Sequence, residues 1–125
     1  MPIVLVVEDD SDLLPILTEA LAAEGWMVLC AASAAGALQI ARSRHVDVVL
    51  TDVRMPDGDG LDLESTFKAI PMLSCIPFVL MTGSPPDMIE LRGRSVLFKP
   101  FGISDASAAL AASLQREEPT FREWD

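Results

Sequence analysis

The chain alternates short runs of apolar residues with longer segments in which apolar residues recur every three or four positions. Short runs rich in β-branched residues are typical of buried strands, and the longer spacing is typical of amphipathic helices. The predicted strands cover residues 3–7, 26–31, 46–52, 77–82 and 95–98. The predicted helices cover about residues 12–24, 33–44, 61–70 and 104–115. This alternation predicts an α/β domain whose parallel sheet is covered by helices on both faces.

The connection between the last two predicted strands is unusually short. Only twelve residues, 83–94, lie between them. A parallel crossover needs about a dozen residues or more, so this one is at the minimum. Pro85 and Pro86 can open a helix in this segment, and Gly93 can end it. We therefore predict a shortened or irregular fourth helix over residues 87–92.

The composition supports one domain and excludes several kinds of partner. The 125 residues suit a single domain over residues 1–117 with a short acidic tail over residues 118–125. The net charge of −10 argues against binding nucleic acid through its phosphates. The longest apolar run, residues 26–32, is too short to span a membrane, and no secretory signal opens the chain. We therefore expect a cytosolic protein without a membrane segment.

Several isolated residues receive ordinary interpretations. Cys30 and Cys75 are 45 residues apart and lack C-x-x-C spacing, and their apolar neighbours favour reduced thiols in the core. His45 is the only histidine, and it precedes the third predicted strand, at the end of the sheet opposite to the strand tips that carry carboxylates. We therefore expect no metal or phosphotransfer role for it. Phe121 and Trp124 lie in the tail, where we expect a frayed terminus.

Polar side chains follow four of the five predicted strands. Asp9 and Asp10 follow the first strand, Asp52 ends the third, Thr82 ends the fourth and Lys99 follows the fifth. Each has an ordinary explanation alone, as a helix cap, a turn residue, a strand-end hydroxyl or a solvated cation. Together they should meet at one edge, because parallel strands all end there. Carboxylates with a hydroxyl and an ammonium group can hold Mg²⁺ and a phosphoryl group, and an aspartate can act as the nucleophile.

These residues lie in a recognisable order of motifs. The motifs are E-D-D at residues 8–10, T-D-V-R-M-P-D-G-D-G around Asp52, Thr82-Gly83, and K-P-F at residues 99–101. In this set the sequence resembles the receiver domains of two-component response regulators, the CheY-like family, over residues 3 to about 115. The resemblance implies a flavodoxin-like fold, in which the five parallel strands have the order 2-1-3-4-5.

The resemblance also implies the role of each acidic residue. Asp52 would accept a phosphoryl group from the phosphohistidine of a histidine kinase or a histidine phosphotransfer protein. Asp9, Asp10 and Asp52, together with the backbone carbonyl of Arg54, would hold Mg²⁺. The position of Arg54, two residues after the acceptor, further suggests that its cation shields or orients the phosphoryl group.

The remaining motifs carry the expected response to phosphorylation. Thr82 would follow the phosphoryl oxygen, Lys99 would pair with it, and the Lys99–Pro100 peptide would be cis. The sequence departs from the family three positions before the lysine, where Val96 stands in place of the usual aromatic residue. Phe98 lies two residues further on, but it is not the matching position. The usual coupling between the threonine and an aromatic side chain is therefore in question.

The expected function is a stand-alone signalling switch or phosphorelay intermediate that acts on a downstream protein. It would be no enzyme beyond its own phosphotransfer and dephosphorylation. A Mg²⁺-dependent phosphohydrolase would need D-x-D-x-[TV], whereas the chain reads D-V-R-M-P from Asp52. A flavodoxin-type electron carrier would need a glycine- and hydroxyl-rich loop where E-D-D stands. An adaptor of receiver fold that acts without phosphorylation remains an open alternative.

Overall fold

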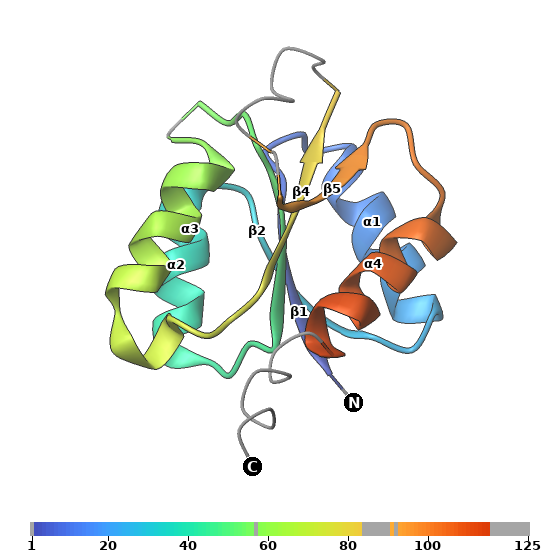
Figure 1. The fold of residues 1–125 in the computed structure, drawn as a ribbon. Helices are drawn as coiled ribbons and strands as arrows, with labels where there is room; N and C mark the ends of the chain where they lie inside the picture. Colours follow the sequence, from blue (N-terminus) through green and yellow to red (C-terminus); the bar gives the residue numbers. More distant parts are fainter. Residues whose placement is uncertain (1, 57, 84–90, 92, 116–125) are drawn as a thin grey trace.

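The computed structural model describes residues 2–56, 58–83, 91 and 93–115. Within these ranges the chain forms a five-stranded parallel sheet between two layers of helices (Figure 1). The strands are β1 (Ile3–Val7), β2 (Met27–Ala31), β3 (Val48–Asp52), β4 (Phe78–Thr82) and β5 (Ser95–Phe98). The helices are α1 (Leu13–Ala23), α2 (Ala34–Ser43), α3 (Gly60–Ala69) and α4 (Ile103–Gln115), with a short 3-10 turn, η1 (Pro71–Leu73).

The strand order is β2-β1-β3-β4-β5, which confirms the predicted topology. Each predicted strand is present, although β2 and β4 each begin one residue later, and β3 two residues later, than the apolar pattern suggests. The prediction of a shortened helix over residues 87–92, apart from Leu91, and that of an acidic tail over residues 118–125 lie outside the described residues. No helix in the described ranges is long and apolar enough to cross a bilayer.

Alternating side chains of the strands build two separate cores. On β1, Leu5 and Val7 pack with α2 and α3, whereas Val4 and Val6 pack with α1 and α4. Figure 1 shows these helix pairs on opposite sides of the sheet. This division follows from the two-residue period of a strand. The two faces therefore use nearly every residue of the central strands, and β3 and β4 are buried along their whole length.

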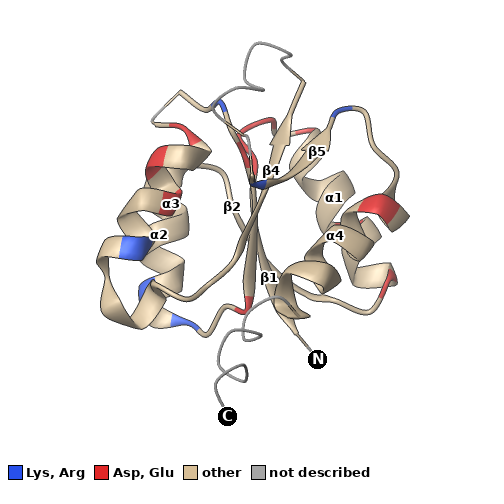
Figure 2. Cartoon of the chain, in the orientation of Figure 1, with Lys and Arg blue, Asp and Glu red and all other residues tan. Residues whose placement is uncertain are grey.

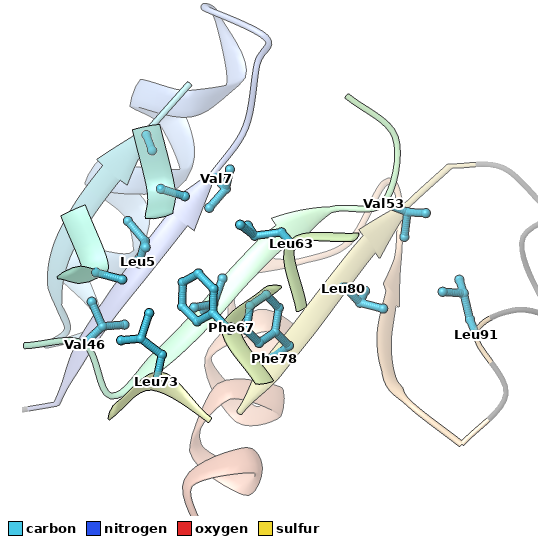
Figure 3. Close-up of a cluster of buried hydrophobic side chains, with 14 residues drawn as sticks. Leu5, Val7, Val46, Val53, Leu63, Phe67, Leu73, Phe78, Leu80 and Leu91 are labelled. Carbon is cyan, nitrogen blue, oxygen red and sulfur yellow. The ribbon is translucent and has the colours of Figure 1, made fainter. Parts of the chain in front are cut away.

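Two aromatic rings lie at the centre of the core between the sheet and α3. Phe67 of α3 and Phe78 of β4 meet edge to face, with ring centroids 5.1 Å apart (Figure 3). Such aromatic pairs stabilise a core beyond the area that they bury. They fix α3 against β4, and α3 follows directly on the loop after Asp52.

The structure corrects the expectation for the cysteines. Cys30 and Cys75 are free thiols, as predicted, but both are exposed instead of buried in the core. Cys30 lies on β2, which is one of the two edge strands of the sheet and is only partly covered. Cys75 lies in the segment between η1 and β4. Apolar neighbours in the sequence therefore did not determine burial at these two positions.

Candidate functional site

The carboxyl ends of the parallel strands border a hollow of about 410 Å³. Its lining comprises Glu8, Asp9, Asp10, Asp52, Arg54, Met81, Thr82, Gly83 and Lys99. Every residue that the sequence places at the candidate site is therefore at this hollow. Figure 2 shows acidic positions gathered around this end of the sheet, at the top of the view. The topology brings them together because all five strands run in the same direction.

Lys99 lies between two buried carboxylates. Its Nζ is 2.6 Å from Oδ1 of Asp52 and 3.1 Å from Oε1 of Glu8. The backbone N–H of Lys99 donates to the carbonyl of Thr82 at 2.8 Å, which extends the β4–β5 pairing beyond the end of β5. The Lys99–Pro100 peptide is cis, as predicted. The ammonium group is thereby held over the tip of β3.

The carboxylates that gather in the structure differ by one residue from the predicted set. Oxygen atoms of Glu8, Asp9 and Asp52 all lie within 4.8 Å of one another. Asp10 also lines the hollow, but its Oδ1 accepts hydrogen bonds from the backbone N–H groups of Asp12 and Leu13. Asp10 therefore serves the start of the first helix rather than the carboxylate cluster.

Glu8 is the site residue that the sequence-based assignment of metal ligands omitted. Its N–H donates to the carbonyl of Ala31 at 3.1 Å, so the β1–β2 pairing continues one residue beyond β1. Its side chain is buried, only 2 % of the residue being exposed. The sequence did hold a signal for this residue, because Glu8 directly follows the five-residue apolar run of the first strand. Strand geometry continues through Glu8, so its side chain must point to one face of the sheet.

A glycine allows α3 to approach the backbone of the phosphoacceptor candidate. A Cβ atom on Gly60 would lie 2.4 Å from the carbonyl oxygen of Asp52 and 3.0 Å from Cγ2 of Thr51. The Gly60 N–H donates to the carbonyl of Val53 at 2.7 Å, and Asp59 caps α3 by accepting from the N–H of Asp62. The start of α3 is thus locked onto the end of β3, which fixes where the Asp52 carboxylate emerges.

Comparison with known proteins agrees with this geometry. The family model for the response regulator receiver domain matches residues 4–111. The chain is 33% identical over 120 residues to the probable transcriptional regulatory protein TcrX of Mycobacterium tuberculosis, covering 90% of this chain and 50% of that protein. It is 28% identical over 122 residues to the KDP operon regulator KdpE of Escherichia coli, covering 94% of this chain and 53% of that protein. The chain thus spans about half the length of the curated relatives that it matches.

Solved structures give the same result. The chemotaxis protein CheY4 of Vibrio cholerae superimposes with a TM-score of 0.82 at 27% identity, over 91% of this chain and 99% of that chain. The receiver domain of the hybrid histidine kinase CckA superimposes with a TM-score of 0.73 at 30% identity, over 90% of this chain and 99% of that chain. This chain belongs to the response regulator receiver domain family.

The donors of this receiver suit a hard divalent cation. Its family uses Mg²⁺ at an acidic pocket, and Mg²⁺ prefers carboxylate and other oxygen ligands. The three clustered carboxylates of Glu8, Asp9 and Asp52 supply only oxygen donors, and the Lys99 ammonium pairs with both buried members of the cluster, Glu8 and Asp52. Excess negative charge and oxygen donors therefore coincide at one point of the receiver.

The same crowding changes the protonation of the receiver's buried acids. Burial is the largest cause that raises the pKa of Asp52, and hydrogen bonding with Glu8 raises it further. Lys99 lowers this pKa, and the net value is about 7. Burial also acts to raise the pKa of Glu8, but hydrogen bonds with Asp52, the Asp10 N–H and Lys99 outweigh it, so that pKa is lowered. The raised pKa of Asp52 and the lowered pKa of Glu8 make Asp52 the more easily protonated of the two acids, and a nearby cation would favour loss of that proton.

The structure also places the other residues that the sequence singled out, Thr82, Val96, Phe98 and His45. Thr82 is buried at the end of β4 and lines the hollow. Val96 is half-buried and packs against the core on the α2–α3 side, while Phe98 is 49% exposed. His45 lies before β3 at the other end of the sheet, where its Nε2 is 2.7 Å from Oδ1 of Asp47.

Proposed function

We propose that this receiver accepts a phosphoryl group onto Asp52 from a phosphohistidine, with Mg²⁺, and so acts as a signalling switch or phosphorelay intermediate. The observation that carries this proposal is the Lys99 ammonium 2.6 Å from the Asp52 carboxylate inside a cluster of three carboxylates. A buried carboxylate next to a cation and a cluster of oxygen donors suits acceptance of a charged group. The receiver is a signalling protein and its chemistry is confined to its own aspartate.

The transfer is a displacement at phosphorus. An oxygen of the ionised Asp52 attacks the phosphorus atom, the bond to the imidazole nitrogen of the donor breaks, and the electron pair returns to that nitrogen. Burial raises the pKa of Asp52 to about 7, so the Lys99 ammonium and a bound cation, which both favour the ionised carboxylate, also favour the form that attacks. Lys99 then pairs with the transferred phosphoryl group instead of with Asp52, and the Thr82 hydroxyl follows a phosphoryl oxygen.

The metal site is the carboxylate cluster. Glu8, Asp9 and Asp52 would hold Mg²⁺, together with the backbone carbonyl of Arg54, which belongs to a residue lining the same hollow. When bound, the ion neutralises negative charge on the phosphoryl oxygens. The sequence-based set also includes Asp10, whose Oδ1 accepts hydrogen bonds from the N–H groups of Asp12 and Leu13.

The partners follow from this chemistry. Relatives of the receiver are response regulators that interact with histidine kinases, so a histidine kinase or histidine phosphotransfer protein is the proposed donor. A downstream protein would read the phosphorylated form. The net charge of −10 disfavours nucleic acid as a partner of this domain.

A single experiment tests the proposal. The protein is incubated with Mg²⁺ and a small phosphodonor such as phosphoramidate, and intact mass is measured. We expect one phosphate adduct, its absence in Asp52→Asn and in EDTA, and its retention in Asp62→Asn, which changes an exposed carboxylate on α3. An adduct that persists in Asp52→Asn would overturn the assignment of the acceptor.

A second function has one observation in its favour. Val96 packs into the core at the position where the family has its mobile aromatic residue, so no aromatic ring is available there to report phosphorylation. An adaptor that binds its partner without phosphorylation would fit this feature. No adduct with any donor, together with unchanged partner binding by Asp52→Asn, would favour the adaptor.

A further inference from the structure

Asp12, the residue just before α1, makes no side-chain capping bond, and the side chain of Asp10 instead caps the turn that leads into α1. Its carbonyl accepts a hydrogen bond from the N–H of Leu14 at 3.0 Å, which is the first bond of an α-helical turn. Its side-chain Oδ1 accepts from the N–H groups of Asp12 at 2.9 Å and Leu13 at 3.2 Å. Those N–H groups would otherwise lack partners, because the first turn of a helix has no carbonyls to receive them.

Asp10 is also tied to the carboxylate cluster through its backbone. The N–H of Asp10 donates to Oε2 of Glu8 at 3.0 Å, while Oε1 of the same glutamate receives Lys99. Asp9 therefore lies between a buried glutamate that is held by Lys99 and an aspartate that is held by the first helix. The backbone on both sides of Asp9 is fixed, although Asp9 itself is exposed.

We propose that Asp10 is a positioning residue, which caps the first helix and so holds Glu8 and Asp9 in the arrangement that binds the metal, and that it is not a metal ligand. This inference rests on the proposed Mg²⁺ site. It accounts for the composition of the cluster, in which Glu8, Asp9 and Asp52 gather and Asp10 does not. The oxygen of Asp10 is needed as a hydrogen-bond acceptor, and its negative charge is not.

Two substitutions with the same change of charge separate these roles. Asp10→Asn keeps a side-chain acceptor for the Asp12 and Leu13 N–H groups, since Asn is as good an N-cap as Asp. Asp10→Ala removes both the charge and the cap. The measured quantities are the Kd for Mg²⁺, by calorimetric titration at about 0.15 M salt, and the amide hydrogen exchange of Asp12 and Leu13.

We expect Asp10→Asn to bind Mg²⁺ within about threefold of the wild type, because only a screened charge is lost. Asp10→Ala should bind about fivefold more weakly than Asp10→Asn, and its Asp12 and Leu13 amides should exchange faster. Asp9→Asn, which changes a member of the carboxylate cluster, should weaken binding by more than about tenfold. The direct comparison of Asn and Ala at position 10 carries the test.

Ser33→Ala is the matched control for loss of a helix cap. Ser33 caps α2, where its Oγ accepts from the N–H of Gly36 at 3.0 Å, and it does not line the hollow. This variant should lower the melting temperature much as Asp10→Ala does, but it should leave the Kd for Mg²⁺ unchanged. A matching loss of Mg²⁺ binding in Ser33→Ala would show that Asp10→Ala acts through general destabilisation, and would overturn the proposal.

The other outcomes are equally decisive. Equal Kd values for Asp10→Asn and Asp10→Ala would overturn the proposal, whether both resemble the wild type or both resemble Asp9→Asn. If the wild type binds no Mg²⁺, the proposed function fails at its metal site. The exchange of the Asp12 and Leu13 amides then still reports separately whether Asp10 caps the helix.

Discussion

Asp47 and Asp52 flank the same strand, β3, and are held in opposite ways. Asp47 has donors of its own: its Oδ2 accepts from the N–H of Ile3 at 2.7 Å, and its Oδ1 is 2.7 Å from Nε2 of His45. Asp52 is buried and shares the single ammonium of Lys99 with Glu8. The Asp47 carboxylate lies at the amino end of the sheet, and both of its oxygens have hydrogen-bond partners. The Asp52 carboxylate lies among more negative charge than the fold neutralises.

This difference shows what distinguishes a structural carboxylate from a reactive one. At the amino end, the carboxylate joins β1 to the start of β3 and needs nothing further. At the carboxyl end, burial and a second carboxylate raise the pKa of Asp52 to about 7 despite the contact with Lys99. An incoming cation can relieve that unfavourable arrangement, and this is the physical basis on which the acceptor role is proposed.

The largest expected effect comes from removing the cation at the carboxyl end. Lys99→Met should slow formation of the phosphate adduct by about a hundredfold, because a charge aimed at the transferring group is lost. The measurement is intact mass against time with phosphoramidate and Mg²⁺. Arg42→Met, which changes a cation in the last turn of α2, is the control and should leave the rate unchanged. A rate within twofold of the wild type in Lys99→Met would contradict the proposed role.

Gly60→Ala tests how closely the site is built onto β3. The added Cβ would meet the Asp52 carbonyl at 2.4 Å, so the start of α3 must shift, and we expect a loss of about 2 kcal/mol in the free energy of unfolding. Gly102→Ala is the control, because its Cβ would meet only the Asp105 carboxylate, at an ordinary contact distance of 3.5 Å. Chemical denaturation measures both variants, and equal stabilities would show that the close approach is not required.

Asp52→Asn should stabilise the metal-free protein, whereas Asp47→Asn should destabilise it. The pKa of Asp52 is raised in the folded state, so the folded state binds the proton more tightly and stability falls as pH rises from about 4 to about 7. Asparagine does not titrate, and the gain should therefore be absent near pH 4 and reach about 1–2 kcal/mol at pH 7.5. Denaturation in EDTA across this range measures it. A gain that is independent of pH would contradict the raised pKa.

Arg54→Ala should have the smallest effect of the four. Arg54 is exposed and lines the hollow, so its cation can shield or orient the phosphoryl group without being needed for transfer. We expect the lifetime of phosphorylated Asp52 to change by about threefold or less, since exposed charges are largely screened. Decay of the adduct after removal of the donor is the measurement. Identical lifetimes would show that the Arg54 cation neither shields nor orients the phosphoryl group.

Much of the fold and the acceptor site could be predicted from local patterns. Runs of five apolar residues identify the strands because a buried strand presents side chains to both faces of the sheet. Asp52, Thr82 and Lys99 could be placed at one edge because they follow parallel strands, and the structure does place them there. The ordered motifs supplied the strand order and the cis Lys99–Pro100 peptide, and both are confirmed.

What the sequence alone determined was therefore which residues reach the carboxyl edge of the sheet. Only the tertiary structure decided how they divide their contacts there. In the run Glu8-Asp9-Asp10, three adjacent carboxylates look equivalent, yet Glu8 is buried beside Lys99 while Asp10 turns to the helix. Likewise the apolar neighbours of Cys30 did not reveal that its own side chain is exposed on β2. Both outcomes depend on contacts between residues far apart in the chain, such as Glu8 with Lys99, and local sequence patterns do not encode such contacts.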